Sequence, residues 1–212
     1  MKGANLPAGI ILAGGRSRRM LGQTKALAVL NGKHLMQHVI DRMRPQVSSL
    51  ALSVDQENPA FECFGLRQVT DPRRGSCGPL GGLMAALEAL PQGSDHLLLA
   101  PCDAPFLPQD LGRRLSERLA QTGLGGCLVR YEQELQPTFS LWHRRLLPDL
   151  RSAVIDEGLG GFKQFLGRVC ISILDWEHGA VSPFFNINTQ EDLARAKLMV
   201  DSGLIASERV TT

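Results

Sequence analysis

The chain has 212 residues, 43% of them hydrophobic, which is enough to bury the core of one large α/β domain. Lys and Arg number 23 against 21 Asp and Glu, and this net charge of +2 gives no global reason to expect a nucleic-acid partner. The longest apolar runs are far too short to span a membrane, so we expect no membrane segment, and the N-terminal run reads as a first strand rather than a signal peptide.

Short apolar runs alternate with helical patterns through the first half of the chain. Continuous apolar runs predict buried strands at 8–13 and 96–101, and 49–54 and 67–70 are two further strand candidates. Apolar stripes predict helices within 34–44 and 80–90, and a third helix opens after Pro108. Such alternation is typical of a parallel sheet with helices on both faces, wound right-handed.

The second half of the chain is less regular. Residues 125–142 predict a hairpin or meander, and apolar residues at 170–174 and 184–188 predict two further strands. A final helix begins at about Thr189, a good N-cap with Glu191 and Asp192 in the first turn. No repeat, linker or low-complexity segment divides the sequence, so we expect a single domain over 1–212.

The first strand runs into "LAGGRSRRM", residues 12–20, which places two glycines before three arginines. Gly14 and Gly15 let the backbone approach a ligand closely and present N–H donors to an anion. Cations that could offset phosphate charge follow at Arg16, Arg18, Arg19 and Lys25. The alternative is a simple glycine turn with solvated arginines. Neither GxxxxGK[ST] nor GxGxxG fits this stretch, which argues against a P-loop NTPase or a dinucleotide cofactor.

Two aspartates follow predicted strands, at the sheet edge where ligands of parallel sheets gather. Asp103 comes directly after the 96–101 strand and is a candidate Mg²⁺ ligand, although it could instead cap the helix after Pro108. Asp71 follows the 67–70 strand, where it could bind a ligand or stabilise the turn before Pro72.

Each of the remaining candidate residues could have either a role in ligand binding or a purely structural role. Gly78 lies in "SCGPLGGL", where exposed amides at a helix start could bind an anion or the glycines could serve close packing. Asn186 and Asn188 would share one face of a strand and suit phosphate, metal-bound water or ribose, but Asn also ends strands. The cysteines are five, scattered and without a CxxC pair, which favours reduced thiols and a cytoplasmic location. Cys77 and Cys102 lie in candidate site loops but have no evident base, so packing is the simpler role.

Together these segments resemble a known family. "LAGGRSRRM", "GPLGGL", "PCDAPFL", "QPTFSL" and "FFNINTQEDL" are similar to motifs of the molybdenum cofactor guanylyltransferases, the MobA family, from about Gly9 to the final helix. The resemblance implies a three-layer αβα Rossmann-like nucleotidyltransferase fold, with a mostly parallel sheet and a mixed C-terminal half. It further implies that 1–107 mainly hold the nucleotide and 108–212 mainly the acceptor.

The family condenses GTP with the phosphate of molybdopterin, or of the molybdenum cofactor, and releases pyrophosphate. The resemblance implies Mg²⁺ on Asp103, phosphate binding by Lys25, and Arg19 as the motif arginine. The remaining matching positions are nucleotide-side residues Leu12, Ala13, Gly14, Gly15, Ser53, Asp71 and Gly78, and acceptor-side residues Asn186 and Asn188. Ser53 stands where the family often has asparagine, and "LGGFKQF" after Gly158 lacks an arginine that members often carry.

The protein would then need no nucleophile or strong base of its own, since the acceptor phosphate is itself the nucleophile, and its task would be to align the two phosphates and offset their charge. The leading hypothesis is guanylyl transfer to the molybdenum cofactor by a monomeric cytoplasmic enzyme, with cofactor carriers or acceptor apo-enzymes as further partners. One alternative is a sibling nucleotidyltransferase that uses CTP with the same cofactor, or a nucleotide with a sugar phosphate. Another is a non-catalytic nucleotide-binding protein that delivers cofactor. Retention of both Lys25 and Asp103 favours an enzyme over such a binding protein.

Overall fold

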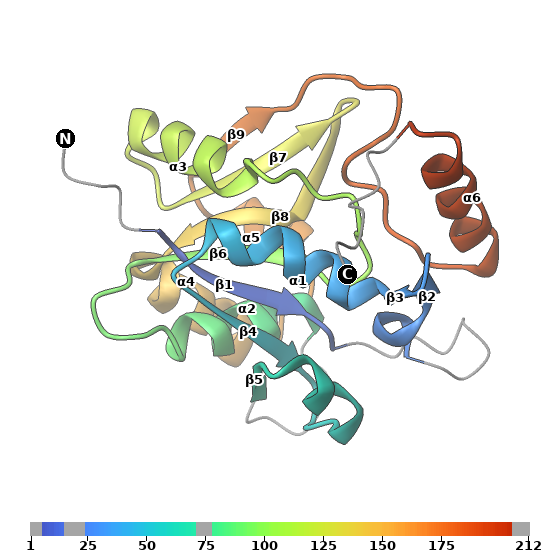
Figure 1. Cartoon of the computed structure of the whole chain (residues 1–212). Helices are drawn as coiled ribbons and strands as arrows, with labels where there is room; N and C mark the ends of the chain where they lie inside the picture. Colours follow the sequence, from blue (N-terminus) through green and yellow to red (C-terminus); the bar gives the residue numbers. More distant parts are fainter. Residues whose placement is uncertain (1–5, 15–23, 71–77, 205–212) are drawn as a thin grey trace.

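Buried apolar strands form the centre of the fold in this computed structural model, which describes residues 6–14, 24–70 and 78–204. Within those residues, seven strands make one sheet in the order β5-β4-β1-β6-β8-β7-β9 (Figure 1). All neighbours pair in parallel except at β8, which is antiparallel to both β6 and β7. The strands are β1 (Ala8–Leu12), β4 (Ser49–Val54), β5 (Arg67–Thr70), β6 (His96–Pro101), β7 (Gly126–Tyr131), β8 (Glu134–His143) and β9 (Ser172–Asp175).

Helices cover both faces of the sheet, and this confirms the three-layer α/β fold with a mixed C-terminal half. One core cluster packs the apolar stripes of α1 and α3 against the sheet, and a second packs α2, α4 and α5 against the other face. The helices are α1 (Leu35–Met43), α2 (Gly78–Glu88), α3 (Leu111–Thr122), α4 (Leu147–Arg151), α5 (Phe162–Leu166) and α6 (Gln190–Asp201). Within the described part of the chain, no helix is both long and apolar enough to cross a membrane.

A third, smaller core lies beyond the end of the sheet. The two-residue strands β2 (Val29–Leu30) and β3 (Lys33–His34) form a hairpin around a turn with positive φ at Asn31 and Gly32. Figure 1 shows α6 beside this hairpin. Buried apolar residues from the two elements and from the segment after β6 join here: Ala28, Leu30, Leu35, Phe106, Ile187, Leu193 and Ala196.

The predicted strand at 184–188 is wrong. These residues join no ladder, and their amides find three separate partners instead. Phe185 N–H donates to Ser182, Ile187 N–H to the carbonyl of Asp103, and Asn188 N–H to the side chain of Asp192. The apolar pattern therefore reflects burial of Phe184 and Ile187 against two different clusters rather than strand alternation.

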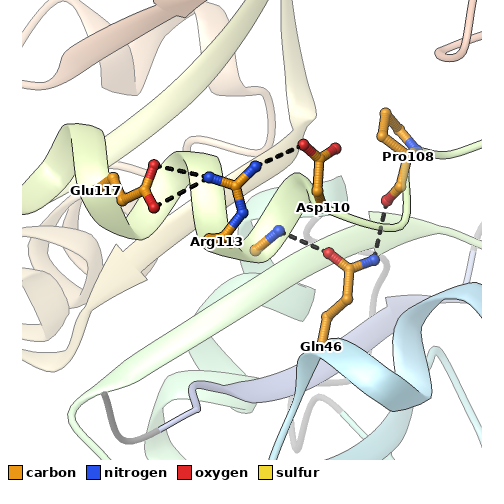
Figure 2. Close-up of polar contacts among 6 residues, drawn as sticks. Gln46, Pro108, Asp110, Arg113 and Glu117 are labelled. Carbon is orange, nitrogen blue, oxygen red and sulfur yellow. Dashed lines mark hydrogen bonds and ion pairs between the residues drawn. The ribbon is translucent and has the colours of Figure 1, made fainter. Parts of the chain in front are cut away.

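A buried glutamine fixes the segment that connects β6 to α3. Gln46 is 6% exposed; its Nε2 donates to Arg42 O at 2.8 Å and to Pro108 O at 2.9 Å. Its Oε1 accepts from Gly112 N–H at 2.7 Å, in the first turn of α3 (Figure 2). The N-cap position of α3 is Asp110, so Asp103 is not the cap of this helix.

Candidate active site

The candidate site begins where the parallel strands β1, β4 and β6 end together. Ala13 N–H donates to Ser53 O at 2.8 Å, and Cys102 N–H donates to Leu12 O at 3.1 Å. These bonds continue the pairing of the strands past their ends and bring the first loop beside Asp103. The prediction that these segments meet at one sheet edge is confirmed.

Gly14 lies close to the residue that follows β4. A Cβ placed there would lie 2.5 Å from Asp55 Oδ1, at the end of a side chain that can rotate, and 3.1 Å from the Asp55 backbone nitrogen. A larger residue would therefore need the Asp55 side chain to turn away and the backbone to shift by a few tenths of an ångström, and glycine avoids both. The sequence predicts that the backbone at Gly14 approaches a ligand closely. In the structure, Gly14 also lies close to another residue of the protein, Asp55.

Lys25 connects the two halves of the chain. It opens a short 3-10 turn, Lys25–Leu27, whose end is closed by Ala28 N–H on Lys25 O. Its Nζ lies 3.4 Å from Asp103 Oδ2 and also donates to Asn188 Oδ1. The side chains of Lys25 and Asp103 are only 17% and 14% exposed, so this ion pair is largely withdrawn from solvent.

Burial dominates the electrostatics of Asp103. Desolvation raises the pKa of its carboxyl above the ordinary value, while the Lys25 ammonium opposes that rise. A buried carboxylate that depends on one ammonium has a strong preference for a further cation. Burial also raises the pKa of the neighbouring Cys102 thiol, and the nearby Asp103 charge adds to the rise. Cys102 is thus a neutral packing residue, in agreement with the sequence interpretation.

The asparagines reach the site from a loop and a helix cap. Ile187 N–H donates to Asp103 O at 2.9 Å. This bond brings the backbone of its sequence neighbours, Asn186 and Asn188, close to the aspartate. Asn186 Oδ1 is buried and has no hydrogen-bond partner among the described residues. Asn188 is held by its own N–H on Asp192 Oδ2 at 3.0 Å and by its Nδ2 on Asn186 O at 3.4 Å.

The first turn of α2 packs against the segment around Gly160. Gly78 has φ +62°, and a Cβ there would lie 2.5 Å from Gly160 O. Leu80 N–H donates to the same oxygen at 3.2 Å. Ser53 is 5% exposed, and its hydroxyl oxygen would lie 2.7 Å from a Cβ at Gly82, so it packs beneath α2. Sequence reasoning missed Gly160, whose only signal was the divergence of "LGGFKQF" from the family pattern.

The donor set at Asp103 fits a magnesium or manganese ion. Both metals prefer oxygen ligands, and the site offers the largely buried carboxylate of Asp103. Across the described ranges, no group of three or more His, Cys, Asp or Glu side chains could hold a metal. Oxygens of a bound phosphate would have to complete the coordination. Gly15, Arg19 and Asp71 of the predicted site lie outside the described residues, as do Arg16, Arg18 and Cys77.

Comparison with known proteins decides the family. Residues 9–170 match the model of the MobA-like NTP transferase domain, which is more than half of the chain. The chain belongs to the MobA-like NTP transferase family. The nucleotidyltransferase resemblance drawn from the sequence motifs is thereby confirmed.

Curated relatives of this MobA-like chain carry one consistent name, molybdenum cofactor guanylyltransferase. The protein of Rhodopseudomonas palustris is 36% identical over 191 residues, which cover 89% of this chain and 91% of the relative. The protein of Rhizobium meliloti is 36% identical and covers 92% of each chain. The protein of Vibrio cholerae is also 36% identical, over 88% of this chain and 89% of its own.

Solved structures agree on the fold. Molybdopterin-guanine dinucleotide biosynthesis protein A of Archaeoglobus fulgidus has a TM-score of 0.77 and 23% identity, covering 92% of this chain and 99% of its own. Rv0371c of Mycobacterium tuberculosis, solved in complex with manganese, has a TM-score of 0.66 and 18% identity. It covers 92% of this chain and 99% of its own.

Proposed function

We propose that this MobA-like protein transfers GMP from GTP to the phosphate of molybdopterin or of the molybdenum cofactor, forming the guanine dinucleotide and pyrophosphate. The observation that carries the proposal is the meeting of Lys25, Asp103 and Asn188 at the end of β1. These three residues belong to a chain that is 36% identical, over 89% of its length, to a Rhodopseudomonas palustris protein named molybdenum cofactor guanylyltransferase. The same contact supports one catalytic unit over 1–212, with the nucleotide held mainly by 1–107 and the acceptor mainly by 108–212.

The reaction needs no nucleophile from the protein. An oxygen of the acceptor phosphate forms a bond to the α-phosphorus of GTP, and the bond from that phosphorus to the α,β-bridging oxygen breaks. The bridging oxygen leaves with its electron pair as part of pyrophosphate. Cys102 lies beside this edge as a partly buried thiol with a raised pKa, which is consistent with direct transfer.

The protein supplies alignment and positive charge. The backbone of Leu12–Gly14 would lie along the nucleotide, and Lys25 would bind its phosphates. Asp103 would hold Mg²⁺, which offsets negative charge on the triphosphate and the departing pyrophosphate. Arg19 would add charge from the first loop, Asp71 and Gly78 would contact the nucleotide, and Asn186 and Asn188 would face the acceptor. GTP and molybdenum cofactor are cytoplasmic substrates in this scheme, and we expect the enzyme to act there as a monomer.

The decisive experiment measures pyrophosphate release with Mg²⁺ and molybdenum-loaded molybdopterin, using GTP, CTP and ATP in turn. Release with GTP alone, together with the guanine dinucleotide product, is expected. Release with CTP alone would replace the proposal by cytidylyl transfer. A folded protein that binds a nucleotide without releasing pyrophosphate would contradict the transferase assignment.

Asp103→Asn tests the metal-binding role. The variant keeps the size of the side chain but loses its charge, and we expect kcat to fall by about 100-fold or more while some nucleotide affinity remains. Asp41→Asn is the matched control, because Asp41 also pairs with a lysine, Lys33 at 2.7 Å, away from the site. We expect the control to retain wild-type turnover. Near-normal turnover of Asp103→Asn would show that the metal is held elsewhere.

A further inference from the structure

One ammonium group serves two residues that lie far apart in the sequence. Lys25 Nζ lies 3.4 Å from Asp103 Oδ2 and donates to Asn188 Oδ1, across separations of 78 and 163 positions. The proposed function gives the same ammonium a third partner, the phosphates of the nucleotide. It also gives the Asp103 carboxylate a second cation. The two sets of contacts compete.

A divalent cation on Asp103 and the Lys25 ammonium would repel each other strongly in a site that is mostly withdrawn from solvent. Removal of the ammonium alone would leave a buried carboxylate without compensation, which is unfavourable. Lys25 can therefore leave Asp103 readily only when another cation takes its place. A metal–nucleotide complex would provide both that cation and a new partner for the lysine.

Asn188 determines how firmly Lys25 is held in its pairing with Asp103. Its position does not depend on the lysine, because Asp192 binds its backbone N–H and the carbonyl of Asn186 accepts from its Nδ2. The bond from Ile187 N–H to Asp103 O fixes the same loop against the aspartate. The amide oxygen of Asn188 is thus a preorganised acceptor that stabilises the Asp103-paired position of Lys25.

We propose that Asn188 is a positioning residue on the nucleotide side, which retains Lys25 at Asp103 until a metal–nucleotide complex displaces it. This inference rests on the proposed function and adds a role to a residue otherwise expected to face the acceptor. Its consequence is counter-intuitive. Loss of Asn188 makes binding of the metal–nucleotide complex stronger, because less of the protein holds its lysine away from the phosphates.

The test is calorimetric binding of the α,β-methylene analogue of GTP, which cannot be cleaved at that bond, in the presence of Mg²⁺. We expect Asn188→Ala to lower the Kd by roughly 3- to 10-fold, the range for removal of one charge-assisted hydrogen bond that is partly exposed. Gln37→Ala is the matched control, because it removes an amide beside a second lysine–aspartate pair, Lys33 and Asp41, away from the site. We expect its Kd to stay within twofold of wild type.

A double-mutant cycle separates this role from a structural one. In a Lys25→Met background, Asn188→Ala has nothing to release, so its effect on Kd should disappear. An unchanged or weaker affinity of Asn188→Ala, or an equal gain in the Lys25→Met background, would overturn the inference while leaving the transferase proposal intact. Failure of the wild-type protein to bind the GTP analogue would instead contradict the proposed function and the inference with it.

Discussion

Gln46 gives the sharpest stability prediction, because a single buried side chain makes three hydrogen bonds. Gln46→Met preserves its length and removes the bonds to Arg42 O, Pro108 O and Gly112 N–H, of 2.8, 2.9 and 2.7 Å. At about 1 kcal/mol net for each bond, and allowing for the apolar gain of methionine, the free energy of unfolding should fall by about 2–4 kcal/mol. The cost is high because the buried N–H of Gly112 loses its acceptor.

The assay is urea unfolding followed by circular dichroism. With a slope of about 2 kcal/mol per molar urea, the expected shift of the midpoint is about 1–2 M. Arg113→Ala is the matched control in the same region (Figure 2). Arg113 binds Asp110 and Glu117, but these three side chains are 60%, 45% and 57% exposed, so water replaces the lost contacts. A midpoint for Gln46→Met no lower than that of Arg113→Ala would refute the assignment of Gln46 as the tie between α1 and α3.

Two further predictions concern the hairpin of β7 and β8 and the end of β8. Glu132 and Gln133 form the two-residue turn of this hairpin, with φ of +50° and +65°, a conformation that Asn and Gly adopt more readily. The double substitution Glu132→Asn with Gln133→Gly should therefore raise the free energy of unfolding by about 1–2 kcal/mol. An unchanged midpoint of thermal unfolding would contradict this. The Nδ1 of His143 accepts a hydrogen bond from Arg145 N–H at the start of the next helical turn. Burial, and to a smaller extent the charge of Arg145, lowers the pKa of the His143 imidazole from its ordinary value of 6.5. The unfolded chain therefore binds more protons below about pH 6.5, so the contribution of His143 to stability is lost as the pH falls through that region. His143→Asn keeps an acceptor without titrating and should make the unfolding midpoint less dependent on pH between 7 and 5, whereas an equally steep dependence would place the titrating group elsewhere.

The centre of the sheet could be predicted because β1 and β6 are buried on both faces. The apolar runs at 8–13 and 96–101 correspond to these two strands, since continuous apolar residues are typical of strands covered on both sides. The stripes of α1 and α3 were equally informative, as each helix buries one face. The prediction of a strand at 184–188 was wrong because Phe184 and Ile187 are buried in different clusters. An apolar pattern in the sequence shows that residues are buried but not which part of the protein covers them.

The candidate site likewise has one part that could be predicted from the sequence and one part that could not. Strand ends place Leu12, Ser53 and Asp103 together through local chain direction alone, so this part followed from the sequence. The partner of Lys25 did not, because the contact with Asn188 spans 163 positions and depends on the small core between the β2–β3 hairpin and α6. No local sequence pattern indicates that core, since its buried members come from three separate stretches of the chain, 28–35, 106 and 187–196.

The capping box of α6 shows how a readable local motif can acquire a use that the sequence does not reveal. Thr189 and Asp192 exchange the two expected bonds, at 3.1 Å from Asp192 N–H to the Thr189 hydroxyl and 3.0 Å from Thr189 N–H to the carboxylate. The same carboxylate oxygen also accepts from Asn188 N–H at 3.0 Å. The start of the helix therefore fixes the residue that holds Lys25. Ile187, one position earlier, is fully buried in the core that α6 shares with the β2–β3 hairpin, and Lys25 lies in the turn just before that hairpin. Helix capping, packing of the third core and placement of the charged pair are thus one arrangement, in which stability of the C-terminal helix and geometry of the site depend on the same few atoms.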